Sequence, residues 1–204
     1  LFIGGQFPRT ESGRSFAVEN ADGNLIANLC RASRKDFRNA VAAARKAQAG
    51  WADRAAFNRS QILYRLAEML DGRRAQFLQE LEAQGASAED AGQEVCASVD
   101  RLVYYAGWCD KYSQVAGTVN PVASSHFNFS VPEPMGVVGI VCPDTPGLLG
   151  LISLMAPVIA GGNTCVVLAS EKQPLCSITF AEVVATSDVP GGVLNILTGF
   201  HEEL

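Results

Sequence analysis

GVVGIVC, at residues 136–142, is a short and continuous apolar run. Such a run is typical of a strand that is covered on both faces. The apolar stretch at 148–160, which ends at two glycines, predicts a buried helix. The pattern then predicts a strand, a helix and a strand at 164–168, 175–186 and 193–197. This β-α-β-α-β order predicts half of a doubly wound sheet with parallel strands.

The carboxyl ends of parallel strands meet at one edge of their sheet, which is where such folds bind small ligands. Three predicted loops, at 143–147, 169–173 and 198–203, converge at that edge. We therefore expect any ligand site of this chain to lie between these three loops. The fold class expected is α/β, with a partial Rossmann-like parallel sheet preceded by a helical layer and β-hairpins.

The part of the chain before residue 112 is expected to form a hairpin and three helices. Asp22-Gly23 lies between two apolar runs, which predicts a hairpin turn. Ser33 is the expected N-cap of a first helix, with Asp36 in its first turn. A second helix is expected over 58–84, and a third from Ser87 onward carries the apolar residues Val95, Leu102, Val103 and Ala106.

Phe127, Phe129 and Val131 alternate with polar residues, which predicts a half-buried strand that ends at Pro132. A strand of this kind should bury one face. The opposite face should lie in solvent.

Composition favours a folded chain that does not bind nucleic acid. Apolar residues make up 48% of the 204 residues and charged residues 18%, which argues against a disordered chain. The net charge is −5 and basic residues do not cluster, so a phosphate backbone would be repelled. The longest apolar stretch, at 148–160, is too short to span a bilayer, and we expect no membrane association.

The cysteines show no metal or disulfide pattern. None of the six belongs to a CxxC pair, and most have apolar neighbours along the chain: Cys30, Cys96, Cys109, Cys142, Cys165 and Cys176. Free thiols in such surroundings pack as small apolar side chains. We expect a reducing compartment, the cytoplasm.

Four motifs follow one another in an order that resembles the aldehyde dehydrogenase superfamily. They are YAGWCDK at 105–111, EPMGVVG at 133–139, PVIAGGNT at 157–164 and GGVLNI at 191–196. The resemblance extends over nearly the whole chain and covers less than half of a family module. It implies that residues 1–111 form the first part of the cofactor-binding domain. It also implies that 112–131 form an oligomerisation arm and 132–204 half of the dinucleotide-binding sheet, with the chain ending before the catalytic domain.

The resemblance implies a reaction and a cofactor. Family members oxidise an aldehyde to an acid with NAD or NADP, using a cysteine nucleophile and a glutamate that activates water. Both of those residues would lie beyond Leu204. The resemblance also implies a homo-oligomer, with an aldehyde as the small-molecule partner of the full-length module.

Carried over position by position, the family's site residues are altered here. Thr145 stands where the family has the asparagine that holds the oxyanion, and losing one such donor costs roughly 3–4 kcal/mol of transition-state stabilisation. Asp144 replaces an aromatic residue and adds negative charge near the cofactor's pyrophosphate. Leu168 replaces the lysine that binds the ribose, and His201 replaces a glycine. The candidate cofactor-binding residues by position are Val141, Cys142, Asp144, Leu168, Ser170, Glu171 and His201.

The altered pocket leaves three hypotheses open. The first is a fragment of an aldehyde dehydrogenase-like oxidoreductase, inactive by itself. The second is a non-catalytic structural or interaction module on the same fold, similar to the degenerate module of family members that carry two. The third is an enzyme of altered chemistry that uses the same cleft. Two residues also have simpler interpretations: Glu171 as a surface carboxylate in the first turn of a helix, and Cys142 as a packing residue.

Overall fold

The computed structural model describes residues 1–20 and 22–203. Its architecture is α/β, as the sequence predicts. The elements in chain order are β1 (Ser15–Glu19), β2 (Leu25–Cys30), α1 (Arg34–Ala52), α2 (Ala56–Gly72), α3 (Arg74–Ala83), α4 (Ala88–Ala106), α5 (Tyr112–Ala116), β3 (Thr118–Asn120), β4 (Asn128–Ser130), β5 (Val137–Val141), α6 (Gly147–Ala160), β6 (Thr164–Leu168), α7 (Leu175–Thr186), β7 (Leu194–Leu197) and a short 3₁₀ helix (His201–Glu203).

The sheet that organises the fold consists of β5, β6 and β7 in that order, and all of its pairs are parallel. Val138 pairs with Cys165, and Val166 pairs with Asn195. The predicted bounds of β6 and α7 match the structure, and β7 starts one residue later than predicted. The prediction that the strands open at one edge is therefore confirmed.

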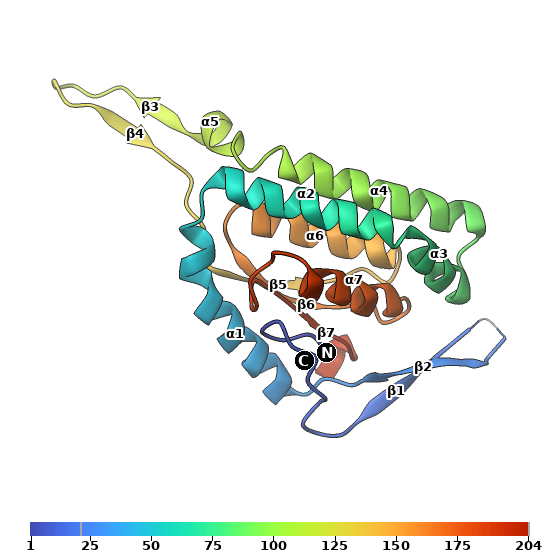
Figure 1. Ribbon diagram of the computed structural model, residues 1–204. Helices are drawn as coiled ribbons and strands as arrows, with labels where there is room; N and C mark the ends of the chain where they lie inside the picture. Colours follow the sequence, from blue (N-terminus) through green and yellow to red (C-terminus); the bar gives the residue numbers. More distant parts are fainter. Residues whose placement is uncertain (21, 204) are drawn as a thin grey trace.

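Helices cover both faces of this sheet, which explains why its strands are apolar runs (Figure 1). On β6, Cys165 and Val167 belong to the core under α6 and α7. Val166 and Leu168 point to the other side and pack with the buried residues of α1. Helices α2 and α4 form an outer layer against α6.

Strand β5 is less covered than its apolar sequence predicts. Val141 is 60% exposed and Gly139 is also exposed, because β5 forms one margin of the sheet in the described chain. The prediction that β5 is covered on both faces is met only in part: Val137 packs against the α1-side cluster and Val138 against the core on the other face, but the end of the strand is exposed. Only β6 has a strand on each side, and all five of its residues are buried.

The other margin of the sheet is extended by the start of the chain. Phe2 forms an antiparallel bridge with Ile196 of β7, with N–H···O distances of 2.8 Å in both directions. The Asn195 side chain, which is fully buried, accepts a hydrogen bond from the Gly4 N–H at 2.9 Å. Its amide group donates to the carbonyl oxygens of Cys165 and Gly192. The first residues therefore pack with the Rossmann-like half of the chain.

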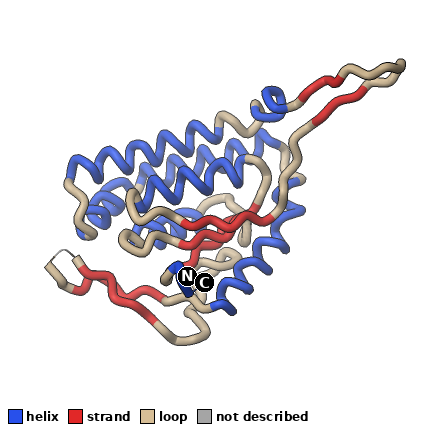
Figure 2. Tube along the Cα trace, turned by 180° about the vertical axis from the view of Figure 1, so that it is seen from behind, coloured by secondary structure: helices blue, strands red, loops and turns tan. Residues whose placement is uncertain are grey.

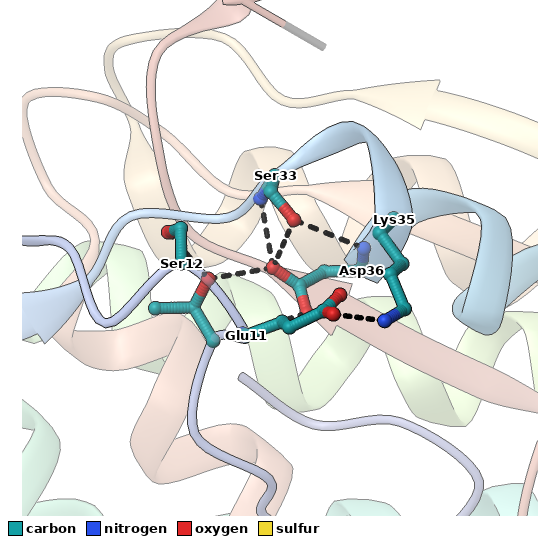
Figure 3. Close-up of polar contacts among 6 residues, drawn as sticks. Glu11, Ser12, Ser33, Lys35 and Asp36 are labelled. Carbon is teal, nitrogen blue, oxygen red and sulfur yellow. Dashed lines mark hydrogen bonds and ion pairs between the residues drawn. The ribbon is translucent and has the colours of Figure 1, made fainter.

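Helix α1 begins at the predicted N-cap. Ser33 accepts a hydrogen bond from the Asp36 N–H, and Asp36 accepts one from the Ser33 N–H, so that both halves of a capping box are present. Figure 3 shows the contacts between Ser33 and Asp36. Asp36 is 4% exposed and also accepts a hydrogen bond from the Thr10 hydroxyl at 2.7 Å. The loop before β1 is thereby tied to the start of α1.

The helix predicted over 58–84 is in fact two helices, α2 and α3. The break is at Arg73, whose backbone has φ −106° and ψ 16°. Gly72 has a high conformational entropy in the unfolded chain and weakens the helix at this point. Helix α2 packs chiefly on α4, and after the interruption α3 packs on both α4 and α7. On α4, Val95, Leu102 and Ala106 are buried, whereas Val103 is 42% exposed.

The segment 112–131 projects away from the other helices and the sheet; it begins with the short helix α5, and β3 and β4 then form a hairpin (Figures 1 and 2). Strand β3 pairs with β4 in antiparallel register, with Val119 opposite Phe129. The expected half-buried strand is not found, because every residue of β4 is exposed. Phe127 is 73% exposed and Phe129 is 59% exposed. The alternation in the sequence correctly predicts an apolar face on this strand, but no other described residue of this chain buries that face.

Two further sequence predictions concern cysteines and membranes. All six cysteines are free thiols. Among the described residues, no helix combines the length and the apolar character that crossing a bilayer requires.

Candidate functional site

The loops that follow β5, β6 and β7 lie side by side at the carboxyl edge of the sheet. The Cys142 N–H donates to the Leu168 carbonyl oxygen at 2.9 Å, and the Ala169 N–H donates to the Leu197 carbonyl oxygen at 2.8 Å. These bonds extend the β5–β6 pairing and the β6–β7 pairing by one residue beyond the ends of β5 and β6. The three loops thus begin at the same level.

Two open clefts lie between these loops. The first has a volume of about 680 Å³ and is lined by Val141, Cys142, Pro143, Asp144, Gly150, Ser153, Leu154 and His201. The second has a volume of about 640 Å³ and is lined by Asp144, Glu171, Phe200, His201, Glu202 and Glu203. Asp144 and His201 belong to both, so the two clefts adjoin. We refer to them together as the edge cleft.

The edge cleft contains five of the candidate residues that the sequence indicates: Val141, Cys142, Asp144, Glu171 and His201. Its lining does not include Thr145, Leu168 or Ser170. Thr145 is exposed on the β5–α6 loop. Leu168 is 9% exposed and belongs to the apolar cluster on the α1 side of the sheet.

Ser170 connects two of the loops. It is 1% exposed, and its hydroxyl donates to the Asp144 carbonyl oxygen at 2.7 Å. The same hydroxyl oxygen accepts the Gln173 N–H at 2.9 Å. Both the donor and an acceptor site of this hydroxyl are therefore used inside the protein. Ser170 holds the β5–α6 loop against the β6–α7 loop.

Glu171 lies in the β6–α7 loop, four residues before α7 begins at Leu175. The interpretation of Glu171 as a residue in the first turn of a helix is therefore wrong. Its carboxylate accepts a hydrogen bond from the His201 N–H. The His201 ring also lies close, with Nδ1 3.6 Å from Oε1 of Glu171. A carboxylate with these partners is less available to a ribose than a free one.

Charged side chains at the edge cleft pair with one another. Lys172 Nζ lies 3.2 Å from Asp144 Oδ2. Arg31, at the end of β2, pairs with Glu203 and stacks over the Phe200 ring with 4.9 Å to its centroid. Both pairs are partly exposed and are worth little in stability.

Cys142 is the thiol closest to the cleft, and its environment favours packing over chemistry. It is 2% exposed, and burial raises the pKa of this thiol to about 12. Because the thiolate is the nucleophilic form, Cys142 is a poor nucleophile near neutral pH. Cys96 lies inside α4 and is exposed.

Two residues that organise the site were not identified from the sequence. Gln173 accepts the Gly147 N–H at 2.9 Å, and Glu94 on α4 accepts the Leu148 and Leu149 N–H groups at 2.8 and 3.0 Å. Glu94 is distant in the sequence, and no local motif signals its contact with α6. Gln173 lies in one of the three predicted loops at the carboxyl edge, and this position is the only feature of the sequence that points to a role at the site.

A comparison with family models decides the relationship of this chain. The model described as the aldehyde dehydrogenase family matches residues 8–204. The chain belongs to the aldehyde dehydrogenase family. The resemblance that the motifs indicate is therefore confirmed.

Individual aldehyde dehydrogenases agree with this result. The putative aldehyde dehydrogenase DhaS of Bacillus subtilis (strain 168) is 33% identical over 208 residues, which cover 100% of this chain and 41% of the relative. The cytosolic 10-formyltetrahydrofolate dehydrogenase of Mus musculus is 33% identical over 98% of this chain and 23% of its own length. The NAD⁺ complex of the Bacillus cereus aldehyde dehydrogenase superimposes with a TM-score of 0.94 and 30% identity, covering 99% of this chain and 42% of that one. The chain thus spans about two fifths of the length of aldehyde dehydrogenases such as these.

Proposed function

We propose that this chain is the first part of the cofactor-binding region of an aldehyde dehydrogenase-like oxidoreductase. The parent reaction would be the NAD(P)-dependent oxidation of an aldehyde to an acid. The observation that carries the proposal is the edge cleft at the carboxyl ends of three parallel strands, in a chain of this family. Ligands bind at this place in open α/β sheets.

The residues present do not fit a tightly bound dinucleotide. The Ser170 hydroxyl and the Glu171 carboxylate are already engaged with groups of the protein. Leu168 offers no charge where a ribose-binding lysine is expected. Asp144 and Glu203 already pair with Lys172 and Arg31, so these cations are engaged, and Glu202 adds a further carboxylate to a cleft that would have to accept a dianionic pyrophosphate. We therefore expect this chain to bind NAD and NADP weakly.

We also propose that the chain does not oxidise aldehydes by itself. Thr145 carries one hydroxyl donor where the family uses an amide, and Cys142 is buried with a raised pKa. The family resemblance implies that the nucleophilic cysteine and the water-activating glutamate of the parent reaction would lie in the portion of family members that this chain does not match.

The second candidate is a non-catalytic structural or interaction module, and the same engaged residues favour it. The arm formed by 112–131 would then be the functional part, as a contact between copies. We propose a homo-oligomer for either candidate, because the arm exposes Val119, Phe127 and Phe129. A cytoplasmic location is the proposal that fits six free thiols.

A restored variant distinguishes the two candidates. Thr145→Asn, Leu168→Lys and His201→Gly would return the family's residue types to the carboxyl ends of β5, β6 and β7, where only His201 lines the edge cleft. If the site is an altered cofactor site, NAD should bind this triple variant at least tenfold more tightly than it binds the wild-type chain, measured by calorimetry. Equal affinity for the two proteins would favour the non-catalytic module. Circular dichroism of the variant checks that it is folded.

A further inference from the structure

Helix α6 begins at the carboxyl edge of the sheet, and its start is held by a residue from another helix. Glu94 lies on α4, 54 residues before Leu148 in the chain. Its Oε1 accepts the Leu148 N–H at 2.8 Å and the Leu149 N–H at 3.0 Å. One carboxylate oxygen thus serves two adjacent amides in the first turn of α6.

The local sequence cannot supply this contact. The N-cap residue of α6 is Pro146, and no side-chain hydrogen bond caps the helix from that position. The first N–H groups of a helix have no partner inside the helix, and buried ones need an acceptor. Glu94 and Gln173 together provide acceptors for the amides of residues 147, 148 and 149.

The negative charge of Glu94 is favourable at the amino terminus of α6. Glu94 is half-buried, and within residues 1–20 and 22–203 no lysine, arginine or histidine forms an ion pair with it. Helix amino termini carry a partial positive charge, which favours a carboxylate at that end. The amides of α6 therefore provide the stabilisation that a cationic partner would otherwise give.

The first turn of α6 is closely packed against Pro143 and Gln173, so its position is coupled to that of the preceding loop. A Cβ atom on residue 147 would lie 2.7 Å from Gln173 Cβ, and one on residue 150 would lie 2.5 Å from Pro143 Cγ. Glycine is thus required at both ends of the first turn. Moving the start of α6 would move Asp144 and Thr145, which lie in the loop between Pro143 and Gly147.

We propose that Glu94 is a positioning residue for the β5–α6 loop. It supplies from within the chain the anion that the start of α6 would otherwise attract from solution, and it thereby sets the position of the loop that carries Asp144 into the edge cleft. The proposal is independent of NAD binding and of aldehyde oxidation. Its experiment uses neither compound, so that its failure is distinct from a failure of the proposed function.

The test is chemical rescue with formate, a carboxylate small enough to replace the one that is removed. Glu94→Ala should lower the Tm by about 2–8 °C, the range expected when an N-cap acceptor is lost from a domain of this size. Sodium formate should raise the Tm of Glu94→Ala more than sodium chloride of equal ionic strength does. The matched control is Glu89→Ala, which removes an exposed glutamate in the first turn of the same helix. Its Tm should show no formate-specific rise, and neither should that of the wild-type chain.

Amide hydrogen exchange reports on the loop itself. The amides of Leu148 and Leu149 should exchange faster in Glu94→Ala than in the wild-type chain, and formate should slow them again. Glu94→Gln keeps an oxygen acceptor without the charge and should give intermediate exchange rates, which maintains the test if Glu94→Ala does not fold. Unchanged exchange at both amides in Glu94→Gln and in a folded Glu94→Ala would overturn the proposal. An equal formate response in Glu94→Ala and Glu89→Ala would do so as well.

Discussion

Single side chains at the carboxyl edge mostly bind to other parts of this protein. Ser170 joins two loops, Glu171 holds the amide of His201, and Asp144 pairs with Lys172. Each of these contacts uses a polar group that a ligand would otherwise need. This internal pairing is the residue-level reason for expecting weak dinucleotide binding.

Asn195 is the most heavily used buried polar side chain of the sheet. Its three hydrogen bonds join Gly4, Cys165 and Gly192, so Asn195→Ala leaves one N–H and two carbonyl groups short of a partner. We expect a loss of about 2–4 kcal/mol in the free energy of unfolding, measured by urea denaturation. The control is Asn39→Ala on the exposed face of α1, which should change stability by less than about 0.5 kcal/mol. A similar effect of the two substitutions would contradict this role for Asn195.

Asp36 should make stability depend on pH. Burial alone would raise the pKa of this carboxyl, but hydrogen bonds from Thr10, Ser33 and Glu11 outweigh burial and hold the pKa below its usual value. A lowered pKa in the folded state means that Asp36 stabilises the fold above its unfolded pKa of about 3.9 and loses this contribution as the pH falls through the folded value.

The corresponding measurement compares Asp36→Asn with the wild-type chain from pH 7 to pH 3. The wild-type chain should be more stable at pH 7, and the difference in Tm should shrink as the pH falls below about 4. Thr10→Val removes the hydroxyl donor to Asp36 and should weaken this pH dependence. A difference in Tm that stays constant across the range would show that the charge of Asp36 does not matter.

At the scale of elements, the sequence predicts best where burial is complete. Strand β6 is buried throughout and its bounds match the apolar run, and α7 likewise matches. Strand β5 has an equally apolar sequence, but its Val141 is exposed. This exposure was not predicted because hydrophobicity does not reveal which strand lies at the margin of the sheet. The break at Arg73 was missed since apolar periodicity continues across it. Glu94 and Gln173 were missed because their contacts depend on tertiary packing.

The first turn of α6 offers a test at this scale. The added methyl group of Gly150→Ala would lie 2.5 Å from Pro143 Cγ, so the loop or the helix must shift. We expect a destabilisation of about 1–3 kcal/mol, the usual effect of overpacking, measured by thermal unfolding. The matched control is Gly139→Ala in β5, where an added Cβ meets no atom within 4 Å. The packing described for α6 is wrong if Gly150→Ala is as stable as Gly139→Ala.

At the scale of the whole molecule, the arm is the part with the least support from the chain itself. The rings of Phe127 and Phe129 lie 5.5 Å apart between centroids, and both are exposed. We predict self-association through this arm. Phe127→Ser combined with Phe129→Ser should reduce the average mass seen by light scattering, while the Tm stays within about 2 °C because neither ring is buried in the monomer. A wild-type chain that remains monomeric at high concentration would contradict the prediction.

The sheet positions the loops of the edge cleft, and neighbouring residues engage the polar groups of these loops. The most direct measurement is a calorimetric titration of NAD into the wild-type chain, repeated with NADP. We predict no binding tighter than about 1 mM for either dinucleotide, which corresponds to no more than about 4 kcal/mol of binding free energy. A micromolar dissociation constant for NAD or NADP would show that the cleft is a working cofactor site and would contradict the account.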